Sequence, residues 1–427
     1  MSHTRHRHLD SLRGVAAMVV VIVHFMASFL PFVIFGDQPK SASHLPTLEA
    51  WFFYPPLGLL VAGQLAVSVF FILSGYVLSL RYLGQPVGLA KTLEMTAKRP
   101  IRLGGLVWFS MSLYALFWYF GWFQNTPAAT LTGSDLWLSL WWQGELDLKV
   151  FFTDLFTQSF SQGTVYNNPL WTIGYELYGS LLVFAFLLLF SAFKYRFLVL
   201  LLLVWLFYES MLVGFWLGAI MADIQRRQWL PIDINPRLKQ AALAFGGLLF
   251  LWLAAYPFYL PAELKAQTIY CWLPSGFSFG LGYPMLAAWL GFTLVLYSRS
   301  IQRWLNGRSL HYLGDVSYAL YVMHVFVIGT WCSWLMVQLH PLMSYGWAFT
   351  WVLLTGIPLC LLLAHWVTRW VDGPAIKLAR WLGYQVKQLA ERPVLQSPFQ
   401  WVERHLLRHP QLPASSTPKN HESAPEN

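Results

Sequence analysis

Residues 9–25, LDSLRGVAAMVVVIVHF, decide the fold. After Asp10 and Arg13 the stretch is almost entirely apolar, which is the pattern of a helix that enters a membrane. His24 lies deep in this apolar run, eleven residues beyond Arg13. At about 100° and 1.5 Å per residue, the two side chains share one helical face and lie about 16 Å apart along the axis. Because an ionisable group at that depth is energetically costly, His24 is a candidate functional residue.

The composition of the whole chain is that of a membrane protein. Of its 427 residues, 57% are hydrophobic and only 11% are charged, and the mean hydropathy is +0.49. This is far more apolar than a soluble globular domain. The three cysteines have no C-x-x-C spacing, so we expect neither a disulfide framework nor a metal site. The sequence therefore predicts an all-α, polytopic bundle of membrane helices.

Apolar runs that are long enough, or nearly so, to cross a bilayer recur along the chain. They cover residues 12–34, 57–80, 101–122, 170–192, 196–208, 210–223, 240–256, 276–297, 311–337 and 343–368. The fifth and sixth runs are short, because one continuous apolar stretch must be divided around Glu209. We predict about ten transmembrane helices.

The positions of the basic residues test this count. Ten spans place both termini and the even-numbered loops on one side of the membrane. That side then carries 25 of the 28 Lys and Arg residues, and only Lys40, Lys149 and Lys265 lie on the other. Basic residues accumulate on the cytoplasmic side of membrane proteins, so we predict that both termini are cytoplasmic. The net charge of +9 is thereby explained without a nucleic-acid partner.

Composition divides the chain into three parts. Residues 1–372 hold the predicted spans and form the membrane domain, in which the longest external segment, about 123–168, can cap the external face. Residues 373–410 mix apolar and basic residues at helical spacing, which is typical of a helix lying on the anionic inner leaflet. Residues 411–427 are polar and rich in Pro and Ser, and we expect them to be disordered.

A basic cluster lies at the predicted cytoplasmic start of the third span. The motif AKRPIRLGG at 97–105 contains Lys98, Arg99 and Arg102, and the two arginines share a helical face. Cations at a helix N-terminus, where backbone amides add positive charge, suit a phosphate. A phosphate-bearing head held by Arg13 and this cluster, with a thin arm that reaches His24, matches the shape of acyl-coenzyme A. The structural alternative is ordinary basic flanking of membrane helices around a packed core histidine.

The fourth predicted span carries a carboxylate. The motif NNPLWTIGYELYGS at 167–180 contains Trp171 and, about two turns into the span, Glu176. A carboxylate at that depth needs a partner, and His24 or a cation is the natural candidate. Glu176 could then orient the imidazole, share a proton with it, or bind an acceptor hydroxyl. A structural ion pair between spans is the alternative.

Four further motif residues are candidates for supporting roles. Ser74, in FFILSGYVLS at 70–79, is small enough to let a helix or a ligand approach closely. Tyr318 and His324, in SYALYVMHVF at 317–326, lie in the ninth predicted span, where core packing also explains each residue taken singly. Asp10 is most simply a helix N-cap.

Taken in order, the motifs LDSLRG with R-x10-H, FFILSGY, KRPIRL, LWTIGYE and SYALYVMH resemble acyltransferase family 3, the bacterial membrane O-acyltransferases. The similarity spans residues 9 to about 372. It implies a ten-helix enzyme of the bacterial cytoplasmic (inner) membrane that moves an acyl group, usually acetyl, from cytoplasmic acyl-coenzyme A to a hydroxyl of a cell-envelope carbohydrate or related acceptor. Two departures from the family pattern are the glycine in LGG after Arg102, where proline is expected, and VDGP at 371–374 in place of a V-E-R-P-like turn.

The resemblance also implies roles for individual residues. Arg13 and His24 match the family's R-x10-H, Arg99 and Arg102 match its R-x-x-R, and Glu176 matches the acidic residue of its LWSLSVE-like segment. The phosphates of coenzyme A are then held by the arginines together with Lys98. His24 acts as general base on the acceptor hydroxyl or carries the acyl group covalently, while Glu176 sets its tautomer.

Two other functions are compatible with the same residues. In a secondary transporter, His24, Glu176 and His324 would form a proton or substrate path across the bilayer. A non-catalytic relative of the acyltransferases would only bind or flip a lipid-linked sugar. The cluster at Arg99 and Arg102 favours the acyltransferase, because a carrier for neutral solutes needs no phosphate site.

Overall fold

The computed structural model describes residues 7–36, 40–157, 160, 163–229, 235–274 and 280–392. Within these residues every named element is a helix, and the one β-type contact is an isolated bridge between Ser41 and Ser134. The predicted all-α fold class is therefore confirmed.

Seven helices are long and apolar enough to cross a membrane. They are built on α1 (Arg7–Phe29), α4 (Gly63–Leu80), α5 (Leu89–Tyr119), α8 (Trp171–Phe190), α11 (Pro236–Ala254), α15 (Arg308–Val327) and α17 (Tyr345–Val367). The other three predicted spans contain shorter helices, which are α9 (Arg196–Leu206), α10 (Val213–Arg227) and α13 (Tyr283–Tyr297). Each of the ten predicted segments thus contains a helix within the described residues, whereas the exact number of crossings and the sidedness of the termini remain predictions.

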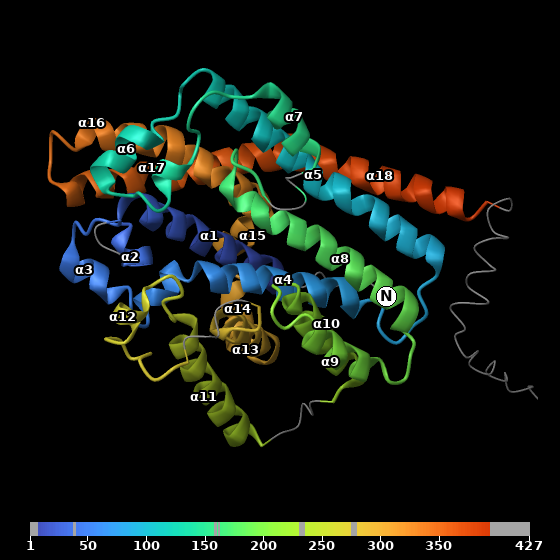
Figure 1. Cartoon of the computed structure of the whole chain (residues 1–427). Coiled ribbons are helices and arrows are strands. Elements are labelled where there is room, and N and C mark those ends of the chain that lie inside the picture. The colour runs from blue at the N-terminus through green and yellow to red at the C-terminus, as the bar shows by residue number, and fades with distance from the viewer. Residues whose placement is uncertain are drawn as a thin grey trace, which may run out of the picture.

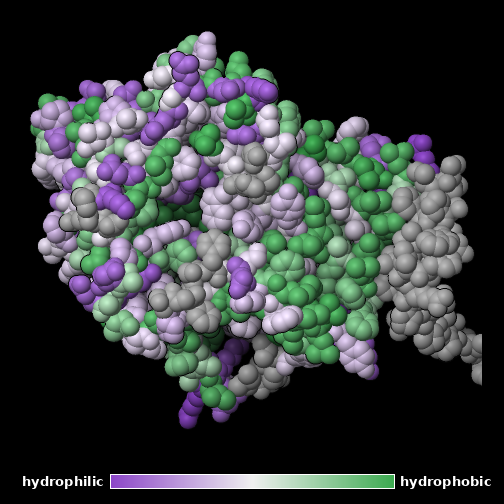
Figure 2. All heavy atoms as spheres, viewed as in Figure 1, coloured by the Kyte–Doolittle hydropathy of each residue, from purple (hydrophilic) through white to green (hydrophobic). Residues whose placement is uncertain are grey.

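Short elements lie between these helices, and one further long helix, α18 (Gly373–Ala390), follows them. The short elements are α2 (Phe32–Phe35), α3 (Pro46–Trp51), η1 (Leu57–Val61), α6 (Asn125–Thr132), η2 (Leu138–Leu140), α7 (Leu148–Phe156), η4 (Asn168–Leu170), α12 (Ala262–Lys265), α14 (Arg299–Leu305), η5 (Ile328–Cys332), α16 (Ser333–Leu339) and η6 (Thr368–Asp372). Figure 1 shows α3, α6 and α16 at one end of the bundle and the far end of α18 at the other. We refer to these as the α6 end and the α18 end. Figure 2 shows hydrophobic residues gathered over α8 and α10, and hydrophilic residues more frequent near α3, α6 and α7.

Two glycines let α1 and α15 pack in close contact at the α18 end. A Cβ atom on Gly14 would lie 2.5 Å from the backbone of Gly314, and one on Gly314 would lie 2.6 Å from the carbonyl oxygen of Asp10. Since real side chains do not approach that closely, only glycine permits this crossing. The crossing brings Arg13 to Ser317, with Arg13 Nε donating to Ser317 Oγ at 3.1 Å.

The segment predicted as a basic amphipathic helix begins with α18. This helix follows α17 through the π-helical segment η6, and it packs along the first half of α5. Ala375 lies against Gly105, and Gly383 lies against the side chain of Lys98. The remainder of segment 373–410 beyond residue 392, and the tail 411–427, lie outside the described residues.

Candidate functional site

A cavity of about 330 Å³ opens among α1, α4, α5, α8 and α15. Its walls combine apolar side chains with charged and hydroxyl groups. Predicted site residues that line it are Asp10, Arg13, Ser74, Arg99, Arg102, Glu176 and Tyr318. Five helices that are distant in the sequence therefore meet at one site.

Each arginine of the cavity lies beside one carboxylate. The pairs are Arg13 with Asp10 at 3.2 Å, Arg99 with Glu176 at 3.6 Å, and Arg102 with Asp372. Carboxylates neutralise guanidinium groups that would otherwise be costly at this depth. A guanidinium can also bind a phosphate, which offers it two oxygens as a carboxylate does.

Hydroxyl groups hold these ion pairs in place. The Ser74 hydroxyl donates to Glu176 Oε1 at 2.9 Å. The Tyr318 hydroxyl donates to the backbone carbonyl of Leu103 at 2.7 Å, and the Arg102 guanidinium lies 5.3 Å from the centre of the Tyr318 ring. The charged wall of the cavity is consequently ordered by neighbours on three helices.

The inner end of the cavity is formed by Tyr321, Thr172 and Phe70. The hydroxyl groups of Tyr321 and Thr172 are 2.7 Å apart, and the Phe70 ring meets the Tyr321 ring edge-on at 5.4 Å. Behind Tyr321 lies His324, with ring centres 6.3 Å apart. The cavity therefore runs from the arginines to within one ring contact of the buried histidine.

His324 is hydrogen-bonded to His24. Its Nε2 lies 2.7 Å from His24 Nδ1, and its Nδ1 lies 3.0 Å from the carbonyl oxygen of Leu320. Because a carbonyl oxygen can only accept, His324 Nδ1 donates to it, and a neutral His324 then presents the lone pair of Nε2. His24 Nδ1 must donate to that lone pair. The chain of two bonds leaves His24 Nε2 as the nitrogen that can accept a proton or attack an acyl group.

Glu176 has a different partner from the one that the sequence favoured. The predicted partnership with His24 is wrong for this geometry, since the carboxylate contacts Ser74 and Arg99, and the imidazole contacts His324. The other predicted option, a cation, is the one observed. The position of Glu176 along its own helix predicts its depth in the membrane. It does not predict how the neighbouring helices are rotated, and their rotation decides which side chain meets the carboxylate.

The structure shows the surroundings of Lys98 and Trp171, and it corrects the prediction for Asp10. Lys98 is not among the described lining residues of the cavity, because it pairs with Glu94 and packs on α18. Trp171 likewise lies outside the lining and contacts Tyr175 edge-on at 5.9 Å. Asp10 is no N-cap, because α1 already includes Arg7, and its carboxylate instead pairs with Arg13.

Sequence reasoning also missed residues of the site. Asp372 belongs to the VDGP segment, which was noted only as a departure from a family pattern, yet it is the partner of Arg102. Thr172 and Tyr321 lie within the quoted motifs 167–180 and 317–326 but were given no role, although both line the cavity. The sequence did offer one indication for Tyr321. It lies three and four residues after Tyr318 and Ser317, so the three hydroxyl groups are close to one another on the helix surface.

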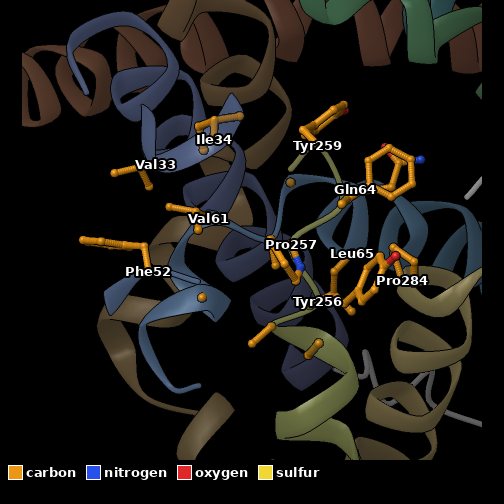
Figure 3. Close-up of a pocket in the computed structure, with 16 residues that line it drawn as sticks. Val33, Ile34, Phe52, Val61, Gln64, Leu65, Tyr256, Pro257, Tyr259 and Pro284 are labelled. Atoms are coloured by element: carbon orange, nitrogen blue, oxygen red, sulfur yellow. The ribbon is translucent and has the colours of Figure 1, made fainter. Parts of the chain in front are cut away.

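A second cavity, of about 30 Å³, lies beside α2 and the first turn of α4 (Figure 3). Residues 254–259 form its opposite wall, and Gln64 donates to Met211 Sδ at 3.4 Å. The predicted site residues are absent from the described lining of this cavity. It is large enough for little more than a water molecule.

Comparisons with known proteins identify the family. The acyltransferase domain model of acyltransferase family 3 matches residues 6–365, so the chain belongs to this family. Acyltransferase clz18 of Cochliobolus lunatus is 26% identical over 395 residues, an alignment that covers 75% of this chain and 82% of that protein. No solved structure matches the chain significantly. Together with the apolar helices, the family identifies a multi-pass membrane acyltransferase.

Proposed function

We propose that the protein is an O-acyltransferase that moves an acetyl group from acetyl-coenzyme A to a hydroxyl of a cell-envelope carbohydrate. The observation that carries this proposal is the cavity that joins three arginines to Tyr321, one ring contact away from the His24–His324 pair. A transferase needs an anion site for its donor and a base at the reacting atoms. The arginines line this cavity, and His24 lies outside its described lining, behind Tyr321 and His324.

The donor is proposed to bind with its phosphates at the arginines. Arg13, Arg99 and Arg102 would exchange their carboxylate partners for phosphate oxygens, and the pantetheine arm would follow the apolar walls toward Tyr321. The separation of about 16 Å between Arg13 and His24 along α1 suits such an extended arm. We propose that Glu176 orients Arg99. This role replaces the one predicted from the sequence, in which Glu176 set the tautomer of His24.

The transfer itself is assigned to His24. Its Nε2 takes the proton of the acceptor hydroxyl while the hydroxyl oxygen bonds to the thioester carbon, and the carbon–sulfur bond breaks. The imidazolium then returns the proton to the coenzyme A thiolate. In the covalent route Nε2 bonds to the thioester carbon as the carbon–sulfur bond breaks. The acceptor oxygen then bonds to that carbon as the carbon–Nε2 bond breaks, and the hydroxyl proton passes to the coenzyme A thiolate. The hydrogen bond from Nδ1 to His324 supports both routes, because it keeps Nε2 unprotonated.

The proposed sidedness is supported by the charge distribution. With both termini cytoplasmic, the α18 end faces the cytoplasm, where acyl-coenzyme A is made, and the α6 end faces outward. We propose the bacterial inner membrane as the location and an envelope glycan as the acceptor.

Transfer of radiolabelled acetyl from acetyl-coenzyme A tests the proposal. Membranes that contain wild type, His24→Ala or Arg13→Ala are incubated with the donor, and label in envelope material is counted. Wild type should label a glycan, and both variants should lose the label. Equal labelling by all three proteins would contradict the proposal, and the labelled product would identify the acceptor.

A further inference from the structure

The loop between α5 and α8 reaches the catalytic histidine from the α6 end. Trp137 of this loop lies with its ring centre 5.0 Å from that of His24, and the two ring planes differ by 22°. The Trp137 side chain is 8% exposed. The imidazole therefore has two aromatic neighbours, His324 at its Nδ1 atom and the indole as a stacking partner.

Hydrogen bonds hold the loop to α1 close to His24. The Ser134 hydroxyl donates to the carbonyl oxygen of Ala27, three residues beyond His24, at 2.6 Å. The same hydroxyl accepts from the backbone N–H of Leu138 at 3.1 Å. The Asn125 amide donates to the carbonyl oxygens of Leu138 and Trp141. The turn that carries Trp137 is consequently fixed relative to the helix that carries His24.

A second anchor lies at Trp142. Its indole N–H donates to the carbonyl oxygen of Tyr166 at 2.8 Å, and its ring occupies the space beside Gly329, where a Cβ atom would lie 2.3 Å away. The backbone of Trp142 has a φ of 53°, a conformation that costs about 1–3 kcal/mol for such a residue and persists only where packing enforces it. At Trp142, therefore, the loop is packed into the protein core.

We propose that Trp137 is a positioning residue for the transfer reaction, an inference that rests on the proposed function. A hydrogen bond at Nδ1 fixes one atom of the imidazole and leaves the ring free to pivot about that atom. Stacking on the indole fixes the plane of the ring. The two contacts together define the direction of His24 Nε2, and with it the alignment of the reacting oxygen, carbon and nitrogen.

Kinetics of four proteins test this role. Trp137→Leu removes the stacking ring and keeps an apolar side chain, and Trp137→Phe keeps a ring. Trp122→Leu is the matched control, because Trp122 lies at the start of the same loop, is 52% exposed, and has ring contacts with Phe117 and Phe120. The rates of thiol release and of labelled acetyl transfer give kcat and the KM for acetyl-coenzyme A.

Trp137→Leu should lower kcat by about 100-fold, the effect of a misplacement of about 1 Å, without changing the KM for acetyl-coenzyme A. Trp137→Phe should recover most of the rate, and Trp122→Leu should match wild type. Stabilisation by coenzyme A in a thermal melt shows that the variant is folded. If Trp137→Leu does not fold, Ser134→Ala decides instead, since loosening the loop should lower kcat at constant KM.

The inference is overturned if Trp137→Leu transfers acetyl at the wild-type rate, if Trp137→Phe is as slow as Trp137→Leu, or if KM rises together with the loss of kcat. Failure of the proposed function has a different signature. In that case wild type itself transfers no acetyl group, whereas failure of the positioning role leaves an active wild type and an equally active Trp137→Leu.

Discussion

Replacing His324 by Leu removes the acceptor for His24 Nδ1. The bond between the two imidazoles is 2.7 Å long, and His324 is fully buried, so water cannot take its place. A buried donor without a partner costs about 1–3 kcal/mol, which corresponds to a loss of about 5- to 150-fold in kcat if the bond is needed in the transition state. The described lining of the donor cavity does not include His324. The KM for acetyl-coenzyme A should therefore stay constant.

The measurement is the rate of thiol release from acetyl-coenzyme A at saturating donor. His324→Gln is the matched variant, because its amide oxygen can accept from His24 Nδ1 at about the place of the imidazole Nε2. We expect this variant to recover about tenfold of the rate lost in His324→Leu, since it restores one hydrogen bond. The tautomer argument would be refuted by a His324→Leu protein that works within threefold of wild type, or by a His324→Gln protein that is no faster than His324→Leu.

Three further substitutions probe the cavity and the helix crossing. Arg99→Gln should raise the KM for acetyl-coenzyme A by about 10- to 150-fold, which is the contribution of one charged hydrogen bond. The exposed control Arg303→Gln should leave the KM unchanged. Equal KM values in all proteins would contradict the phosphate site. Glu176→Gln leaves a buried guanidinium unpaired, so its melting temperature should fall and coenzyme A should stabilise it more than wild type, which a melt with and without coenzyme A measures. Gly314→Ala places a Cβ atom 2.6 Å from the Asp10 carbonyl oxygen and should lower the free energy of unfolding by about 1–3 kcal/mol; unchanged stability in denaturant titrations would contradict the close crossing of α1 and α15.

The fold class could be predicted because long apolar runs leave few alternatives. A chain segment in lipid must satisfy its own backbone hydrogen bonds, so each run becomes a helix. Every predicted segment indeed contains one. The number of crossings is harder to predict, because α9 and α13 are shorter than a bilayer and could tilt, pair or stop within it. The hydropathy of a segment shows that it is apolar. It does not show how far the segment extends into the membrane.

The members of the site could be predicted better than their pairings. Arg13, Arg99, Arg102 and Glu176 stand out because charges are rare in apolar runs, and the structure gathers all four around one cavity. Which carboxylate meets which arginine depends on how each helix is rotated, and periodicity within one helix carries no such information. The contact of Trp137 with His24 depends on a loop more than one hundred residues away in sequence, and aromatic composition alone gave no reason to select it.

The most direct test of the central claim separates donor binding from transfer in one purified variant. His24→Asn is reconstituted beside wild type, and each protein is melted with coenzyme A and assayed with labelled acetyl-coenzyme A and envelope material. The account predicts equal stabilisation by coenzyme A and a loss of transfer of about 100-fold or more, the usual contribution of a general base. A His24→Asn protein that transfers acetyl at the wild-type rate would contradict the assignment of the chemistry to His24.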